Sequence, residues 1–364
     1  MPPTFAHSYT KDQIFIPTDA AARVLHVVDP SDETISSALS EYLVSTRHLE
    51  HWVLIGGDSS TLLRFLPGAE PAGIISLPIG RRARLRALAD AYNKVKPSRV
   101  HAHSFSAGAY VRLTPSIPAD SIVYSPHCYE FERRDHRRAK RVLIATCEYL
   151  LAPRARTVAV CTAHEAQLAA RLHRTAKIVH VPCVPRSDTL DPSALQSPAT
   201  LGSVAVAVGP LSSQRDPAFF AAVAAAARSN ITWIWIGDGE PRYKRLLEKA
   251  GVCVTGHRTY GNVLHLLRSA DVYVHTAAWE GNCDTLLQAV AADLPIAARS
   301  IPALEALRLP GLASTPAALA DRVHRLLTSP LDRRASAESA RRAFRSHTAG
   351  TQAARLRELY ESNR

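Results

Sequence analysis

The sequence has no stretch of about 18 apolar residues, the length a helix needs to cross a membrane. Its first residues, MPPTFAHSYTKDQIF, lack the basic segment and apolar core of a secretory signal. The six cysteines form no C-x-x-C pair and are scattered among apolar runs, which argues against a zinc site or a disulfide framework. These absences favour a cytoplasmic protein with buried thiols.

Acidic residues are in the minority, with 32 Asp and Glu against 44 Lys and Arg, so the net charge is +12. This charge suits nucleic acid, anionic lipid or phosphorylated ligands alike. Two basic runs, 81–86 (RRARLR) and 133–141 (RRDHRRAKR), lie in the first half of the chain. They contain no aromatic residues for base stacking, so nucleic acid is the less favoured partner, while a solvated helix face and a peripheral contact with the inner face of an anionic membrane both stay open.

Short apolar runs alternate with amphipathic segments, which predicts an α/β fold with parallel sheets and helices on both faces of each sheet. The predicted strands are residues 23–28, 52–55, 73–77, 99–102, 121–124, 157–161, 177–181, 204–208, 232–236, 252–255, 270–276 and 294–298. The predicted helices are residues 35–46, 82–95, 138–151, 163–172, 217–228, 241–250, 260–269, 316–327 and 335–360, with one more beginning near 284.

A chain of 364 residues is long enough for about two domains. The alternation stops in a Pro-, Ser- and Asp-containing stretch, which predicts a linker at 186–203 between an acceptor-binding domain at 1–185 and a nucleotide-sugar-binding domain at 204–345. The last segment, 346–364, is expected to form a helix that can pack back on the first domain.

The stretch 279–299 (WEGNCDTLLQAVAADLPIAAR) is expected to form a loop, a helix and a strand. Asp284 is predicted to cap the helix through its side chain, so that Thr285, Leu286 and Leu287 form its first turn. Free backbone N–H groups at that turn would make an anion site, with Glu280 before it and Gln288 after it.

Several motifs resemble those of the GT-B glycosyltransferases of retaining family 4. Residues 280–295 (EGNCDTLLQAVAADLP) are similar to the family pattern E-G-x-P-N-T-L-L-E-A-x-A-x-G-x-P. Residues 208–217 (VGPLSSQRDP) are similar to V-G-R-L-S-x-Q-K-D-P, and 236–239 (IGDG) and 254–258 (VTGHR) fall where the family has its I-G-x-G and T-G-x-R segments. The resemblance implies two Rossmann-like domains facing across a cleft.

The resemblance further implies transfer of a sugar from a nucleotide diphosphate sugar to a glycan or lipid-linked glycan precursor, with no cofactor and no metal. Glu280 would bind the donor sugar, Arg215 the leaving diphosphate and Gln288 the ribose, while His127 would lie near the reacting sugar. The complete implied donor set is Gly209, Arg215, Gly237, Gly256, His257, Arg258, Glu280, Asn282, Cys283, Asp284, Thr285, Leu286 and Gln288.

Three positions depart from the family pattern. Pro210 replaces a donor-binding Arg, Glu33-Thr34 replaces a glycine pair, and Gln288 replaces an acidic residue. A catalytically inactive relative that acts as a binding or scaffolding protein is therefore the alternative, and a sugar-phosphate epimerase of the same fold is less favoured because the motif order follows the transferases.

Each singled-out residue also has a simpler interpretation. Glu280 could be an exposed loop carboxylate, Arg215 a solvated loop cation, and Gln288 an ordinary polar residue of a helix. Cys283 is expected to be a small packing residue rather than a nucleophile. His101 and His103 are expected to bond backbone groups near the end of the sheet.

Overall fold

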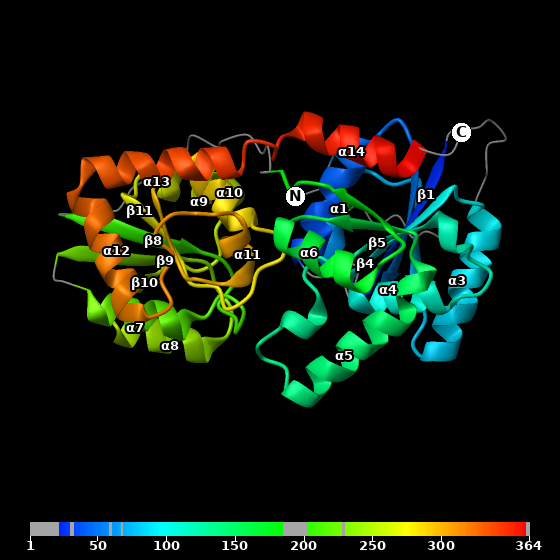
Figure 1. The fold of residues 1–364 in the computed structure, drawn as a ribbon, viewed down its shortest axis with the longest axis horizontal. Coiled ribbons are helices and arrows are strands. Elements are labelled where there is room, and N and C mark those ends of the chain that lie inside the picture. Colours follow the sequence, from blue (N-terminus) through cyan, green and yellow to red (C-terminus); the bar gives the residue numbers. More distant parts are fainter. Residues whose placement is uncertain are drawn as a thin grey trace, which may run out of the picture.

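The computed structural model describes residues 22–29, 33–57, 60–66, 68–184, 202–227 and 230–361, which form two α/β domains side by side (Figure 1). The linker predicted at 186–203 lies almost wholly outside the described residues, since only Gly202 and Ser203 of it are described. The predicted α/β class with two Rossmann-like parallel sheets is confirmed.

The first domain is built on a seven-stranded sheet in the order β3-β2-β1-β4-β5-β6-β7, and every strand pair in it is parallel. Its strands are short apolar runs because helices cover both faces of a parallel sheet. The strands are β1 (Arg23–Val28), β2 (Glu50–Gly56), β3 (Gly73–Leu77), β4 (Arg99–His103), β5 (Ile122–Ser125), β6 (Thr157–Val160) and β7 (Lys177–His180). The helices are α1 (Glu33–Ser45), α2 (Ser60–Leu63), α3 (Arg81–Val95), α4 (Ser104–Leu113), α5 (Arg138–Leu151) and α6 (Ala163–Leu172).

The second domain holds a five-stranded parallel sheet in the order β10-β9-β8-β11-β12. Its strands are β8 (Ser203–Val208), β9 (Ile231–Ile236), β10 (Cys253–Val254), β11 (Val272–His275) and β12 (Ile296–Ala298). Its helices are α7 (Pro217–Ala226), α8 (Pro241–Lys249), α9 (Tyr260–Arg268), α10 (Asp284–Ala291), α11 (Pro302–Ala306), α12 (Pro316–Thr328) and α13 (Pro330–Ala343). In both domains the strand order reverses next to the first strand, the place where α/β sheets bind ligands.

Helix α4 was not expected from the sequence, because its residues include Ser and Gly, which favour helices weakly. Tertiary packing supplies the stability, since Ala107, Gly108 and Val111 are buried. A Cβ at Gly108 would lie 2.5 Å from the Tyr124 ring, so the helix approaches β5 closely there. The five-residue helix α11 was likewise not predicted.

The single helix predicted at 335–360 is wrong, because the chain forms two helices, α13 and α14 (Ala349–Glu361). The break lies where His347 Nδ1 hydrogen-bonds the carbonyl of Cys183 at 3.0 Å. Beyond it, α14 packs on the first domain next to α1 (Figure 1), and Leu356 and Leu359 join a core cluster with Val24 and Val179. The C-terminal helix therefore belongs to the packing of the first domain.

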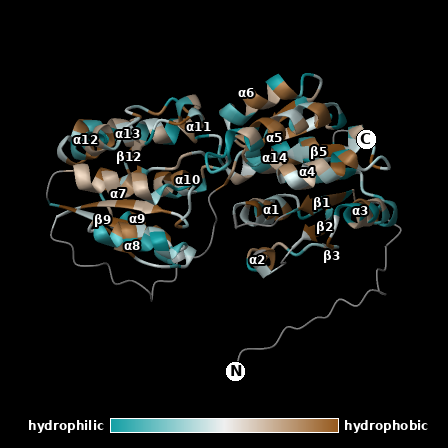
Figure 2. Cartoon of the chain, turned by 90° about the horizontal axis from the view of Figure 1, so that it is seen from below, coloured by the Kyte–Doolittle hydropathy of each residue, from teal (hydrophilic) through white to brown (hydrophobic). Residues whose placement is uncertain are grey.

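The apolar side chains concentrate on the strands and on the inner sides of the helices. Figure 2 shows β1 and β3 in brown, whereas much of α8 is teal. Most residues of the strands next to the sheet centre, such as Val27, Leu54 and Val206, are almost fully buried. Within the described part of the chain, no helix is long and apolar enough to pass through a bilayer.

Candidate active site

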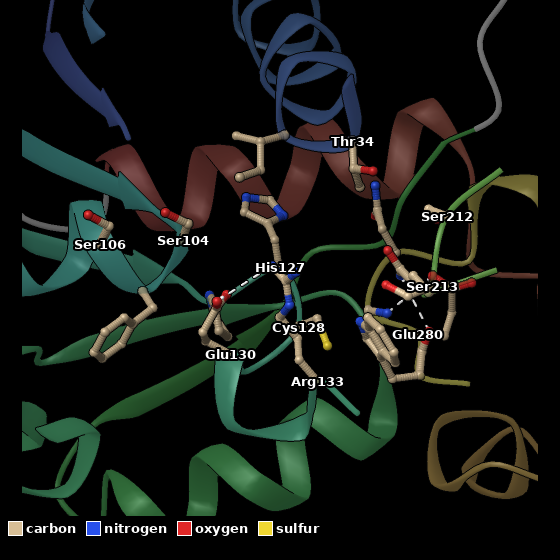
Figure 3. Close-up of a pocket in the computed structure, with 17 residues that line it drawn as sticks. Thr34, Ser104, Ser106, His127, Cys128, Glu130, Arg133, Ser212, Ser213 and Glu280 are labelled. Atoms are coloured by element: carbon tan, nitrogen blue, oxygen red, sulfur yellow. Dashed lines mark hydrogen bonds and ion pairs between the residues drawn. The ribbon is translucent and has the colours of Figure 1, made fainter. Parts of the chain in front are cut away.

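A cavity of about 370 Å³ lies between the two domains, at the carboxyl ends of their strands. In Figure 3, Ser104 and Ser106 lie on one side of His127, and Ser213 and Glu280 lie on the other. The residues that line the cavity come from both domains: Thr34, Ile35, Ser104, Phe105, Ser106, Pro126, His127, Cys128, Glu130 and Arg133 from the first, and Ser212, Ser213, Gln214, Trp279, Glu280, Gly281 and Asn282 from the second.

The loop after β5 carries His127 in a fixed, unusual backbone conformation. His127 and Cys128 have φ values of 49° and 87°, in the left-handed region that side chains other than glycine disfavour. Glu165 holds this loop, since its carboxylate accepts hydrogen bonds from the N–H groups of Cys128 (2.6 Å) and Cys161 (2.7 Å). Burial raises the pKa of Glu165 to about 7, although these N–H bonds favour its ionised form.

Sequence reasoning missed Glu165, although a signal for it was present. Thr162 and Glu165 have the T-x-x-E spacing of a capping box, and the Thr162 side chain accepts from the Glu165 N–H. The pattern predicts that a Glu at this position reaches backward to backbone N–H groups. The tertiary structure adds the second N–H group, from Cys128.

The His127 ring is buried, with 9% exposure, and extends toward the end of α1 that carries Thr34 (Figure 3). Its Nε2 lies 2.9 Å from His103 Nδ1. Among the described residues, its Nδ1 has no hydrogen-bond partner. Burial lowers the pKa of His127 to about 4, so the ring is neutral at pH 7.

The bonds expected between His101 or His103 and backbone groups are wrong. His101 bonds the hydroxyl groups of Tyr360 (2.7 Å) and Ser125 (2.8 Å), while both ring nitrogens of His103 face other imidazoles. Their side chains lie on one face of β4, two residues apart, where adjacent strands also place polar side chains.

Glu280 is buried, with 4% exposure, so the interpretation as an exposed loop carboxylate is wrong. Its carboxylate forms an ion pair with the guanidinium of Arg215, and His275 Nε2 lies 3.3 Å from the same oxygen. Burial alone would raise the pKa of Glu280, but the neighbouring Arg215 outweighs it and the pKa falls to about 2. Arg215 is also largely buried and is therefore no solvated loop cation.

In the part of the chain that the structure describes, the first N–H groups of α10 have no protein acceptor. Cys283, at φ 40°, is the N-cap residue, and no side chain caps the helix. The predicted cap by Asp284 is therefore wrong, because Asp284 is already the first helical residue and accepts instead from the Asn282 amide at 2.9 Å. Within the described part of the chain, the N–H groups of residues 283–286 bond no protein oxygen.

The side chains around this helix start are largely buried. Asn282, Cys283, Thr285 and Leu286 are between 0% and 6% exposed. Burial and the nearby Glu280 raise the pKa of Asp284 to about 8, so this carboxyl group is mostly protonated at pH 7. Little negative charge from Asp284 therefore opposes an anion at the helix start.

Gly281 brings the two domains into contact beside the cavity. A Cβ at this position would lie 2.5 Å from the Cys128 Cβ, 2.7 Å from the Cys128 nitrogen and 2.8 Å from the His127 carbonyl oxygen. Only glycine lets the Glu280 loop approach the His127 loop this closely. The contact sets the distance between the two halves of the site.

Three of the predicted donor-site glycines meet at the ends of β8, β9 and β10. A Cβ at Gly237 would lie 2.1 Å from the Gly209 carbonyl oxygen, and Gly237 and Gly256 form an isolated bridge. Arg215 passes beside this cluster, since a Cβ at Gly209 would lie 3.0 Å from its Nε. His257 and Arg258, the two residues after Gly256, are exposed.

The three departures from the family pattern lie in different surroundings. Pro210 is exposed in the loop after β8. The side chain of Glu33 lies outside the described residues, whereas its neighbour Thr34 lines the cavity. Gln288 is half-buried, and its Oε1 has no partner among the described residues.

Comparison with known proteins agrees with this geometry. Residues 202–329 match the family model for "glycosyl transferases group 1", and residues 33–184 match the model for a "glycosyl transferase 4-like domain". No curated protein sequence matches the chain significantly.

Solved structures share the fold across nearly the whole chain. Sucrose-phosphate synthase from Thermosynechococcus elongatus is 16% identical, with a TM-score of 0.73 over 94% of this chain and 98% of that one. Anabaena HepE in complex with UDP-glucose is 15% identical, with a TM-score of 0.73 over 93% of this chain and 99% of that one. WaaG, a glycosyltransferase involved in lipopolysaccharide biosynthesis, is 15% identical, with a TM-score of 0.64 over 93% and 99%. With both halves matched in the family's order and two parallel-sheet domains meeting at one cavity, the chain belongs to the group 1 glycosyltransferases of the GT-B fold.

Proposed function

We propose that the chain is a retaining, metal-independent glycosyltransferase that uses a nucleotide diphosphate sugar. The observation that carries the proposal is the cavity between the domains, which the His127 loop lines from the first domain and Glu280, Gly281 and Asn282 line from the second. These three residues come just before the start of α10, and Arg215 is paired with Glu280. Unpaired N–H groups at a helix start, next to a buried cation, are suited to a diphosphate.

In this proposal the diphosphate binds the N–H groups of residues 283–286, with Arg215 beside it. Fixed N–H dipoles and a guanidinium can stabilise the charge that develops on the leaving group, which gives a metal-free route. The Glu280 carboxylate accepts hydrogen bonds from hydroxyl groups of the donor sugar. Gln288 faces the ribose, and its buried Oε1, which has no partner among the described residues, accepts a hydrogen bond from a ribose hydroxyl.

Retention is what the family resemblance implies, and the way the carboxylates of the cavity are held bears on the route by which it would occur. Glu280 is paired with Arg215, while Glu130 accepts from His136 at 2.8 Å and lies 3.5 Å from Arg133. Neither carboxylate is available as a nucleophile without breaking its ion pair. We therefore propose that the leaving group departs and the acceptor attacks on the same face of the sugar. During this step the departing diphosphate and the positively charged sugar remain together as one ion pair.

Thermal unfolding with a panel of nucleotides and nucleotide sugars tests the proposal. UDP and UDP-glucose come first because HepE structures contain them. A ligand at about 100 times its Kd should stabilise the protein by about 2.7 kcal/mol, a rise in melting temperature of roughly 3–4 °C when all 364 residues unfold together. If no nucleotide gives a rise, the exposed Pro210 in place of an Arg favours the alternative, a non-catalytic relative that serves as a scaffold.

We further propose a glycan or lipid-linked glycan precursor as the acceptor, at the inner face of a membrane. Thr34, Ser104 and Ser106 of the first domain line the cavity. The hydroxyl groups of Ser104 and Ser106 donate to Asp29, so their oxygens would accept hydrogen bonds from hydroxyl groups of the acceptor. All six cysteines are free, which suits the reducing conditions of the cytoplasm.

Helix α5 supports the membrane contact. Val142, Leu143, Tyr149 and Leu150 are between 59% and 69% exposed, and their spacing puts them on one side of the helix. The exposed basic residues at its start are Arg137, Arg138 and Lys140. Exposed apolar side chains beside basic ones are typical of a helix that lies in an anionic membrane surface. Part of the basic run has other roles, since Arg133 pairs with Asp135 and Arg141 bonds the carbonyl of Phe131.

Sedimentation with vesicles that contain anionic lipid should show binding at low salt. Changing Arg138→Gln and Lys140→Gln together should weaken it about 30-fold, at about 1 kcal/mol per basic residue. Leu143→Asp should weaken it as well, whereas Leu331→Asp, at an 80% exposed site in the other domain, should not. The membrane contact is ruled out if the native protein stays in the supernatant at low salt.

A further inference from the structure

Four imidazoles form one line of hydrogen bonds through the first domain and end at the cavity. His51 Nδ1 lies 3.0 Å from His26 Nε2, His26 Nδ1 lies 3.0 Å from His103 Nε2, and His103 Nδ1 lies 2.9 Å from His127 Nε2. They come from β2, β1, β4 and the loop after β5, and none is more than 9% exposed. Of the four, only His127 is among the residues that line the cavity.

Thr46 fixes the direction of the hydrogen bonds at the far end. His51 Nε2 lies 3.0 Å from the Thr46 carbonyl oxygen and 3.1 Å from its Oγ1. The carbonyl oxygen can only accept. The hydroxyl group of Thr46 donates its single proton to the Tyr42 carbonyl at 2.7 Å, so toward His51 it can also only accept. The proton of this contact must therefore be on His51 Nε2.

The direction then propagates along the line, because a neutral imidazole has one N–H donor and one acceptor nitrogen. Burial lowers the pKa of His51, His26, His103 and His127, so all four are neutral at pH 7. With its proton on Nε2, His51 accepts from His26, His26 accepts from His103, and His103 accepts from His127. The proton of His127 is thereby placed on Nε2, which leaves a lone pair on Nδ1.

We propose that Thr46, acting through His51, His26 and His103, locks His127 in the Nε2–H tautomer, so that Nδ1 accepts a hydrogen bond from a sugar hydroxyl in the cavity. The hydrogen bond to a sugar hydroxyl rests on the proposed function, whereas the tautomer lock does not. Nδ1 is the atom that has no partner among the described residues, and it is itself buried, so a sugar hydroxyl that bonds it must displace the atoms that cover it. His51, His26 and His103 are positioning residues, and His127 acts as an acceptor rather than as a general acid.

A metal ion is the competing interpretation of the same cluster. One nitrogen each of His26, His101 and His103 lies within 4.8 Å of the others, which is a spacing that a metal ion could use. In the structure, however, both nitrogens of each of these three rings are in hydrogen-bond contact with another side chain. A metal would have to break the line and the bonds to Tyr360 or Ser125.

Nitrogen-15 NMR of the full-length protein, labelled at histidine and free of substrate, tests the lock directly. The couplings from ring protons to nitrogen distinguish the two tautomers, and the signals lost in His127→Asn identify His127. The expected result is His127 with its proton on Nε2. A proton on Nδ1, a mixture of tautomers, or one equivalent of bound zinc in the purified protein would overturn the proposal.

Variants at His51 separate the lock from simple structural support. His51→Phe removes the link to Thr46, so the Nε2–H direction is no longer imposed and a measurable fraction of the His127 rings should carry the proton on Nδ1. His51→Gln can accept from His26 and donate to Thr46, so it should restore the native tautomer. His101→Gln changes a buried imidazole outside the line and serves as the control. An unchanged His127 tautomer in folded His51→Phe contradicts the proposal, whatever the outcome of the nucleotide-binding tests.

Discussion

Arg215→Leu should remove the rise in melting temperature that a nucleoside diphosphate gives the native protein. Arg215 is the buried cation beside the α10 start, and its loss withdraws a charge-assisted partner from the diphosphate. Rates of sugar transfer or donor hydrolysis should fall by about 10²–10³-fold, as when one stabilising donor is removed from a transition state. Differential scanning fluorimetry with UDP, and UDP release from the donor, measure the two effects.

The single substitution also costs stability, because it leaves the Glu280 carboxylate buried without its partner. Breaking one side of a buried ion pair costs about 3–5 kcal/mol. The double variant Arg215→Leu with Glu280→Leu is therefore the matched control, since it removes both charges and should regain much of the lost stability. It should still bind no diphosphate. If the double variant shows the native rise with UDP, Arg215 does not bind the diphosphate.

Gly281→Val should lower turnover by about 100-fold or more, because displacement of reacting groups by about 1 Å can cost that much. The atoms a side chain would meet include the Cys128 nitrogen and the His127 carbonyl oxygen, both backbone atoms, which cannot move aside without shifting the loop. The two halves of the site must then separate. Nucleotide binding, which depends mainly on the second domain, should be weakened much less.

Turnover and the nucleotide-induced thermal shift, measured on the same preparation, check this prediction. Gly350→Ala is the control, because it adds a side chain on α14 where, apart from the adjacent residues and the backbone of the same helix, no atom lies within 4 Å of the new Cβ. It should leave both measurements near the native values. Native turnover in Gly281→Val would mean that the contact between Gly281 and the His127 loop is absent when the reaction occurs.

Periodicity in the sequence predicts much of the fold. Apolar runs predict β1 and β3 at their observed bounds, and amphipathic spacing predicts α5 and α6 at theirs. These signals are local, because a strand or a helix in an α/β domain shows its buried side in its own residues. The break between α13 and α14 was not predicted, although Thr348, just before α14, is a residue type that caps helices and its hydroxyl accepts from the Thr351 N–H at 3.2 Å. The break lies where the chain leaves one domain and reaches the other.

The sequence by itself determined the two-domain α/β architecture and the order of the motifs around Glu280, because both are written in local composition and spacing. The tertiary structure decided which side chains meet: Glu280 with Arg215, Glu165 with the N–H of Cys128, and His127 with His103. The two residues of each pair lie 65, 37 and 24 positions apart in the sequence, in that order. Hydrogen bonds and ion pairs act over a few ångströms in space, so only the folded chain could bring these partners together.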